Sequence, residues 1–262
     1  MKDETYDTDD KAVDLILDDS VAIITFSRPP VNALDRIRIA AIEARVREAS
    51  RRREIKLIAI AGKGQDFCAG TDIKEHRPED IGELLRAFHS LVRLLLTLDV
   101  PTAALVQGRA LGGGAELALA CDFIFAETTA VFGFPEIRLG VFPPVASVLL
   151  GRRIGRTKAA DLILCGAVMT AEAAERKGLI NALVNPGDLI NAVETMRQRF
   201  ESFSASSLRH ARRALFLGAA GDPLSALSAV EKSYLTDLMK TEDAQEGISA
   251  FLEKRPPIWT NR

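Results

Sequence analysis

The sequence predicts an α/β protein whose sheet is mostly parallel, followed by a helical C-terminal part. Two observations lead to this prediction. Up to about residue 135, short apolar stretches alternate with amphipathic stretches of helical length, the order expected of parallel strands joined by helical crossovers. From about residue 143, strand-like stretches nearly disappear and helix-like stretches dominate.

The N-terminal half supplies the predicted strands. Residues 13–19 and 21–27 are short alternating or β-branched stretches around a polar turn, and they predict a hairpin. Residues 55–62, 101–108 and 122–127 are almost continuously apolar, which indicates buried strands. The first two of these strands end at glycine.

Helices are predicted between and after these strands. Residues 33–53 place apolar side chains at helical spacing, and residues 78–98 do the same with Pro78 near the first turn. A third helix is expected directly after the glycines 112–114. Further helices are predicted at 143–154, 156–166, 170–178, 186–203, 207–218, 222–240 and 241–255, with one more strand at 179–184.

No tandem repeat or low-complexity linker divides the chain. We expect residues 1–12 to form a disordered tail, residues 13–200 to form the core and residues 201–262 to form a C-terminal helical region. Helices without a sheet of their own often cover a neighbouring subunit. The apolar faces of 207–218, 224–240 and 246–255 therefore predict contacts between subunits.

Composition excludes several function classes. The net charge of −2 argues against nucleic acid or an anionic membrane as the main partner. The acidic N-terminus is no signal peptide, and no apolar stretch is long enough for a membrane helix, so a cytoplasmic protein is expected. Cys68, Cys121 and Cys165 show no paired spacing and are predicted to be buried free thiols.

Two turns at strand ends carry the candidate chemistry. Residues 55–72 leave a strand through a glycine-rich loop and enter a helix near Thr71, and residues 101–116 do the same through Gly112 and Gly113. The first N–H groups of a helix have no partner within it. Two such turns side by side would hold an oxyanion between two N–H groups.

Two glutamates stand close to these turns in the sequence. Glu116 lies one turn into the apolar helix that follows the glycines, and Glu136 follows Pro135 among apolar residues. A carboxyl group in apolar surroundings has a raised pKa and exchanges protons near neutral pH. Two such groups near one oxyanion site suggest an acid and a base that add or remove water.

Each signal also has a purely structural interpretation. In that case the three glycines form only a tight turn, Glu116 pairs with an arginine such as Arg109, and Glu136 stabilises a helix N-terminus. Asp72 is expected to cap a helix, and His76 to have a surface or supporting role. The three histidines show no metal-ligand spacing, and we find no nucleotide or nucleophilic-serine motif.

Taken in order along the chain, these stretches resemble the crotonase (enoyl-CoA hydratase/isomerase) superfamily. The resemblance covers nearly the whole chain after residue 20. It is carried by RPPVNAL (28–34), GQDFCAGTDIKE (64–75), VPTAALVQGRALGGGAELALACD (100–122), FGFPEIRLGVFP (132–143), LCGAVMTAEAAERKGLIN (164–181) and EGISAFLEKRPP (246–257).

The resemblance implies a core of repeated ββα units, trimers or hexamers, and no metal or other cofactor. It implies that the N–H groups of Thr71 and Gly113 bind the thioester carbonyl, and that Glu116 and Glu136 position and activate water. The family pattern also suggests substrate contacts. These are expected from Arg28, Ala33, Ala69, Thr71, Asp72, Ile73, Gly112 and Gly113.

The sequence departs from an ordinary hydratase at two places. Thr71 stands where a smaller residue is common, and Pro143 and Pro144 replace a glycine-rich segment. Together with residues 74–92, the double proline resembles the cyclohexa-1,5-diene-1-carbonyl-CoA hydratases of anaerobic benzoyl-CoA degradation. A cyclohex-1-ene-1-carbonyl-CoA or linear enoyl-CoA hydratase is one alternative, and a non-catalytic acyl-CoA-binding protein is another.

Overall fold

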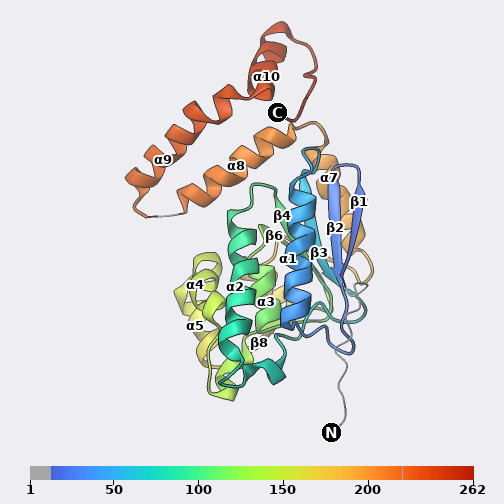
Figure 1. Cartoon of the computed structure of the whole chain (residues 1–262), viewed down its shortest axis with the longest axis vertical. Helices are drawn as coiled ribbons and strands as arrows, with labels where there is room; N and C mark the ends of the chain where they lie inside the picture. The colour runs from blue at the N-terminus through green and yellow to red at the C-terminus, as the bar shows by residue number, and fades with distance from the viewer. Residues whose placement is uncertain (1–12, 220) are drawn as a thin grey trace.

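The structure, a computed structural model, describes residues 13–219 and 221–262 (Figure 1). The main sheet has the strand order β1-β2-β3-β4-β6-β9. Its strands are β1 (Val13–Asp18), β2 (Val21–Phe26), β3 (Leu57–Gly62), β4 (Thr102–Val106), β6 (Phe123–Glu127) and β9 (Ala182–Val184). β1 and β2 form the predicted antiparallel hairpin, and each later strand runs parallel to its neighbour. The predicted parallel sheet is confirmed, while the tail predicted for residues 1–12 lies outside the described residues.

The central strands of the main sheet are buried on both faces, whereas the edge strand β1 is largely exposed. Ile58 and Ile60 of β3 join the larger core cluster, whereas Leu57 and Ala59 join a smaller cluster on the other face. The two-residue repeat of a strand produces this alternation. The helices on the larger cluster include α1 (Arg36–Ser50), α2 (Ile81–Thr97) and α3 (Gly113–Leu119), and α7 (Leu189–Glu201) covers the smaller one. Because both faces are covered, the strands read as continuous apolar stretches.

The second long helix begins later than the sequence predicts. α2 starts at Ile81, so Pro78 lies before the helix and not in its first turn. A short 3₁₀ helix, η2 (Ile73–His76), precedes it and ends at Arg77, whose backbone is extended. A proline disfavours helical backbone in the residue before it, which explains the break.

A second, three-stranded sheet was not predicted. Its order is β5-β7-β8, formed by β5 (Arg109–Leu111), β7 (Val131–Gly133) and β8 (Val168–Thr170). Strands of three residues are too short to show a period, so only the pairing reveals them. This small sheet matters for the site, because β5 leads into the glycines 112–114 and β7 leads to η3 (Pro135–Leu139).

The predicted helices after residue 143 are present. α4 (Pro144–Ile154), α5 (Arg156–Leu164) and α6 (Ala171–Arg176) follow one another along the chain, with α4 packed against α3 and α5 against α4. Cys68 and Cys121 are buried as predicted, but Cys165 is exposed. Cys165 is the C-cap of α5 and follows Leu164, which is also exposed, so the prediction of burial is wrong for this surface end of the helix.

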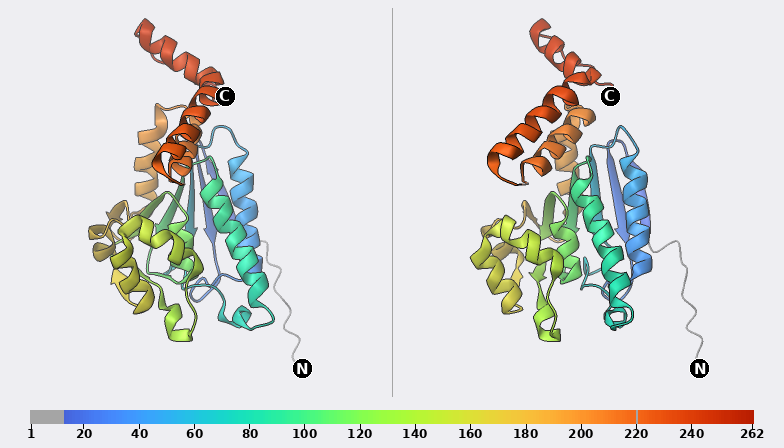
Figure 2. Two further views of the ribbon diagram at one scale, coloured as in Figure 1. Left: turned by 90° about the vertical axis from the view of Figure 1, so that its left-hand side faces the viewer. Right: turned by 60° about the vertical axis from the view of Figure 1, so that its left-hand side comes forward.

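The last helices extend away from the sheets. They are α8 (Ala205–Gly218), α9 (Pro223–Thr236), η4 (Leu238–Lys240) and α10 (Glu242–Glu253). Figure 2 shows α9 and α10 projecting beyond the core. Arg212 anchors α8, because its guanidinium donates to Asp122 (2.6 Å) and to the Leu95 carbonyl (2.5 Å). In the described part of the chain, no helix is long and apolar enough to span a membrane.

Candidate active site

One pocket of about 610 Å³ brings the predicted site residues together. The pocket is lined by Thr71, Gly113, Glu116 and Glu136, and His76 lies on its wall as well. Apolar side chains of α2 and of the segment between η3 and α4 form most of the remaining wall. These lining residues are Ile81, Leu84, Leu85, Phe88, Leu139, Val141, Phe142, Pro143 and Pro144.

Thr71 and Gly113 lie on two adjacent turns. Cys68 pairs with β5, because its N–H donates to the Arg109 carbonyl (2.9 Å) and its own carbonyl accepts from Leu111 (3.0 Å). A Cβ atom placed on Gly113 would be 3.2 Å from the Thr71 nitrogen. Gly113 is the first residue of α3, so its N–H has no partner within the helix. The two N–H groups therefore lie close enough to serve one small acceptor.

The three glycines each have a steric reason. Gly112 has a φ of 49°, and a Cβ there would lie 2.6 Å from the Glu136 carboxylate. A Cβ on Gly113 would lie 2.8 Å from Thr71 Cγ2, and one on Gly114 would lie 2.2 Å from the Cys68 carbonyl oxygen. These separations are shorter than van der Waals contact. The glycines therefore let both Thr71 and Glu136 approach the start of α3.

Glu116 is buried in the first turn of α3, with 4% of its surface exposed. One carboxylate oxygen accepts a hydrogen bond from the backbone N–H of Ala146, at 2.9 Å. Burial raises the pKa of Glu116 to about 7, and the Ala146 N–H opposes this shift while the Glu136 charge adds to it. Glu116 is therefore balanced between acid and base at neutral pH.

The Ala146 bond gives Glu116 a structural task as well. Ala146 is the third residue of α4, and the N-cap of that helix, Pro143, has no side chain that can accept a bond. Proline at the first helical position has no N–H, and its φ suits a helix start. Glu116 thus supplies the acceptor that the first turn of α4 otherwise lacks. The helix predicted over residues 143–154 is confirmed and begins at Pro144.

Glu136 lies on η3 in a more open position. One of its carboxylate oxygens is buried and has no hydrogen-bond partner among the described residues. Burial raises the pKa of Glu136, whereas its own backbone N–H and the nearby His76 lower it. A carboxylate with an unused acceptor beside a pocket is well placed to hold a water molecule.

The interpretation that pairs Glu116 with Arg109 is wrong. The Arg109 guanidinium binds Asp66 instead, at 2.7 and 2.9 Å. Glu136 does lie in the first turn of a 3₁₀ helix, as its structural interpretation requires. Among the residues described, no cluster of three or more His, Cys, Asp or Glu side chains is arranged to bind a metal.

The predicted substrate contacts divide into two groups. Thr71, Ile73 and Gly113 line the pocket, and Gly112 borders it through its approach to Glu136. The other predicted contacts lie outside the lining, on the loops beside it. These are Arg28, Ala33, Ala69 and Asp72.

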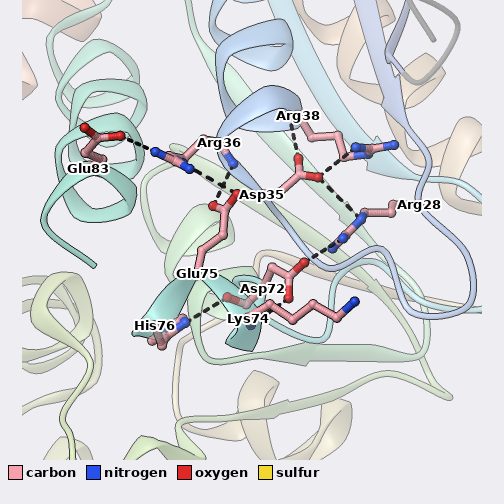
Figure 3. Close-up of polar contacts among 9 residues, drawn as sticks. All are labelled: Arg28, Asp35, Arg36, Arg38, Asp72, Lys74, Glu75, His76 and Glu83. Atoms are coloured by element: carbon pink, nitrogen blue, oxygen red, sulfur yellow. Dashed lines mark hydrogen bonds and ion pairs between the residues drawn. The ribbon is translucent and has the colours of Figure 1, made fainter. Parts of the chain in front are cut away.

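Arg28 and Asp72 bind each other, as Figure 3 shows. The Arg28 guanidinium donates to Asp72 at 2.5 Å and to the Ala33 carbonyl at 3.3 Å. Asp72 also accepts from the Lys74 N–H at 2.9 Å, so the predicted helix cap is confirmed, although the helix is the short η2. Burial raises the pKa of Asp72, but the Lys74 N–H and Arg28 outweigh it and leave that pKa below its usual value. Asp72 is therefore a structural carboxylate.

Several residues that line the pocket or hold its side chains were not predicted. Ala146 escapes sequence analysis because it acts through its backbone. Leu84, Leu85 and Phe88 were seen only as part of an apolar helix face, and nothing in that pattern distinguishes a pocket wall from core. Phe142 is 65% exposed, which is unusual for a large apolar residue and becomes understandable once the pocket is known.

Comparison with known proteins supports a single family. Residues 17–262 match the family described as Enoyl-CoA hydratase/isomerase. A cyclohexa-1,5-dienecarbonyl-CoA hydratase of Thauera aromatica is 37% identical over 245 residues, covering 94% of this chain and 95% of that protein. A probable enoyl-CoA hydratase of Mycobacterium bovis is 39% identical over 248 residues, covering 94% and 96%.

Solved structures agree. An enoyl-CoA hydratase subunit I of Geobacillus kaustophilus has a TM-score of 0.88 at 34% identity, and covers 96% of this chain and 98% of that chain. DspI of Pseudomonas aeruginosa has a TM-score of 0.89 at 28% identity, over 98% of this chain and 100% of that chain. The chain therefore belongs to the enoyl-CoA hydratase/isomerase family, the crotonase superfamily.

Proposed function

We propose that this enoyl-CoA hydratase adds water to a cyclic conjugated dienoyl-CoA, cyclohexa-1,5-diene-1-carbonyl-CoA, in anaerobic benzoyl-CoA degradation. The observation that carries the proposal is the pocket itself. Two backbone N–H groups and two carboxyl groups, both with raised pKa, share about 610 Å³ with an apolar wall. Hydratases of this family use no cofactor, so these groups have to supply the chemistry.

The first role is to stabilise negative charge on the thioester oxygen. The N–H groups of Thr71 and Gly113 lie on adjacent turns and would both donate to that oxygen. When water attacks the β-carbon, electrons move from the double bond onto this oxygen. Such donors act strongly because they are already oriented before the reaction begins.

The second role is proton transfer by Glu116 and Glu136. As water adds to C2 of the diene, one carboxylate takes its proton and a dienolate forms. A proton is then delivered to C5, which leaves a double bond between C1 and C6, a 1,4-addition. After renumbering, the product is 6-hydroxycyclohex-1-ene-1-carbonyl-CoA. Two carboxyl groups in different surroundings suit this reaction, because one must accept a proton and the other must donate one.

The choice of a cyclic substrate rests on two supports. The relative of Thauera aromatica carries the name of a cyclohexa-1,5-dienecarbonyl-CoA hydratase. In this chain the pocket wall includes Pro143 and Pro144 together with Phe88 and Phe142, which form a rigid apolar surface for a ring. The relative of Mycobacterium bovis is named only as a probable enoyl-CoA hydratase, so a linear substrate is the second candidate.

The test is a substrate panel. Initial rates of the purified protein are measured with the dienoyl-CoA, with cyclohex-1-ene-1-carbonyl-CoA and with crotonyl-CoA, and products are identified by mass spectrometry. We expect the highest kcat/KM for the diene. In deuterated water, one carbon-bound deuterium should appear at C5. A clear preference for crotonyl-CoA refutes the cyclic substrate, and binding of all three without turnover supports a non-catalytic acyl-CoA-binding protein.

We also propose that residues 201–262 form the trimerisation region of a cytoplasmic trimer or hexamer. On α8–α10 the exposed apolar side chains include Leu215, Leu224, Leu227, Phe251 and Leu252, each more than 60% exposed. Within α9, Ala226 is the residue that the structure describes as buried. A surface of this kind is expected to pack against another copy. Light scattering that shows a stable monomer of 28.5 kDa would contradict the proposal.

A further inference from the structure

We propose that His76 is a positioning residue for the hydration reaction, which fixes the Thr71 side chain beside the oxyanion site and shares the pocket with Glu136. The inference rests on the proposed roles of Thr71 and Glu136. His76 lies at the end of η2 and lines the pocket. The sequence suggested only a surface or supporting role for it.

The ring of His76 bridges two neighbouring residues. Its Nδ1 lies 2.9 Å from the Asp72 carbonyl oxygen, a contact that Figure 3 draws. A carbonyl oxygen only accepts, so Nδ1 carries the hydrogen. In the neutral ring, Nε2 is then an acceptor, and it lies 3.3 Å from the Thr71 hydroxyl. The hydroxyl therefore donates to Nε2.

Fixing the hydroxyl also fixes the Thr71 methyl group. A β-branched side chain has few rotamers, so the bond to His76 selects one of them. In that rotamer, Cγ2 faces Gly113, where a Cβ would be only 2.8 Å away. The methyl group thus acts as a spacer between the two turns whose N–H groups are proposed to bind the oxyanion. Loss of the His76 bond would free this spacer.

Other contacts hold η2 itself in place. The Arg36 N–H donates to Glu75 at 3.1 Å, and the Arg36 guanidinium also binds Glu83 on α2 (Figure 3). Asp72 is bound by Arg28. Since these contacts do not involve the imidazole, removing His76 should leave the fold of η2 intact. A kinetic effect can therefore be separated from a structural one.

His76 also acts on Glu136 through charge. When the ring is protonated, Nε2 donates to the Thr71 hydroxyl instead of accepting from it, so the contact is kept, and the positive charge lowers the pKa of Glu136 against the upward effect of burial. The other charged groups on the pocket lining are Arg77 and Glu116, and the segment of His76 itself carries Asp72, Lys74 and Glu75. Removing the imidazole would leave Glu136 protonated to higher pH. In the plot of rate against pH, the change that reflects ionisation of Glu136 should then shift to higher pH.

The experiment compares His76→Phe, His76→Asn and Thr71→Val with the parent, using the best substrate of the panel between about pH 5 and pH 9. His76→Phe keeps a ring but loses both contacts, and we expect kcat to fall roughly 10- to 100-fold with little change in KM, as for small misplacements of reacting groups. His76→Asn keeps a donor near Asp72 and should recover part of the rate. His210→Gln removes an imidazole from α8 and is the matched control.

Thr71→Val keeps the shape and the N–H of residue 71 but removes the hydroxyl. If His76 acts through this hydroxyl, the variant that combines His76→Phe with Thr71→Val should show a smaller fold-loss of kcat than the product of the two single fold-losses. A parental kcat and pH profile in His76→Phe would overturn the inference, as would a lower melting temperature with unchanged kinetics. Should His76→Phe not fold, a parental kcat in Thr71→Val overturns it. Glu136→Gln, measured alongside, tests the proposed function separately.

Discussion

Glu116 and Glu136 have the same functional group and face the same pocket, yet they belong to different parts of the structure. Glu116 is buried in an α-helix and binds the backbone of a second helix. Glu136 lies on a short 3₁₀ helix, and one of its oxygens has no partner in the part of the chain that the structure describes. Both carboxyl groups line the pocket, but Glu116 is also tied to a second helix, whereas one oxygen of Glu136 is left without a bond among the described residues.

The strongest test of this comparison is the effect of each carboxyl group on rate. Glu116→Gln and Glu136→Gln keep the side-chain shape, so both proteins should fold and bind acyl-CoA. Turnover should fall by roughly 100- to 10,000-fold in each, the usual range for a lost general acid or base. The measurement is kcat on the best substrate of the panel. If Glu116→Gln keeps about half the parent rate or more, the two-glutamate mechanism is wrong.

Gly113, the first residue of α3, offers the next test. Gly113→Ala would place a methyl group against Thr71 Cγ2 and separate the two N–H groups. We expect a loss on the order of 100- to 1,000-fold in kcat, comparable with the loss of one oxyanion donor. Gly64→Ala is a control glycine variant, because nothing lies within 4 Å of a Cβ there, although its φ of 89° carries some strain. Equal rates for both variants would argue against an oxyanion site at Gly113.

The two glutamates should also differ in how they make stability depend on pH. The folded-state pKa of Glu116 is about 7, above its ordinary value of 4.5. The stability associated with its proton is therefore fully present below pH 4.5 and is lost as the pH rises through 7. Relative to Glu116→Gln, the parent should lose about 3 kcal/mol of unfolding free energy across this window.

Denaturant unfolding of the parent and Glu116→Gln at several pH values measures this difference. The difference in unfolding free energy between the two proteins should widen steadily from pH 4.5 to pH 7. Glu136→Gln is the natural comparison, and its difference from the parent should change less because Glu136 is less buried. Parallel stability curves for the parent and Glu116→Gln would mean that the carboxyl group of Glu116 is not raised in pKa.

The smallest expected effect concerns the start of α4. Glu116→Ala removes the acceptor of the Ala146 N–H, and a buried donor without a partner costs about 1–3 kcal/mol. Glu136→Ala removes no comparable bond, and its unfolding free energy should stay within about 0.5 kcal/mol of the parent. Both values come from chemical denaturation at one pH below 4.5, where Glu116 is protonated. Equal losses in the two variants would remove the structural distinction between the glutamates.

Much of the fold was predictable because long elements leave a clear pattern. Apolar stretches predict the strands β3, β4 and β6, and helix-like stretches predict the helices after residue 143. The small sheet was missed, since three residues are too few to show the two-residue period of a strand; β9 is equally short and was found only as part of the apolar stretch 179–184. The position of Cys165 was also missed, because a helix end can turn toward solvent without any change in local composition.

The site was partly predictable for a different reason. The glycines 112–114 mark a place where the backbone needs room, and Glu116 is conspicuous in an apolar helix. The bond from Ala146 to Glu116 was invisible, because any residue except proline offers the same N–H. The bridge from His76 to Thr71 depends on the 3₁₀ geometry of η2, which the sequence suggested only as the start of a helix.

The bond between Ala146 and Glu116 has a consequence for the evolution of this chain. A descendant that lost hydratase activity would still need an acceptor at the start of α4, so selection for folding alone would keep a glutamate or glutamine at position 116. No such requirement holds Glu136 in place. Under the proposed mechanism, residue 136 is therefore the position whose identity would distinguish a working hydratase from a descendant that has kept only the fold.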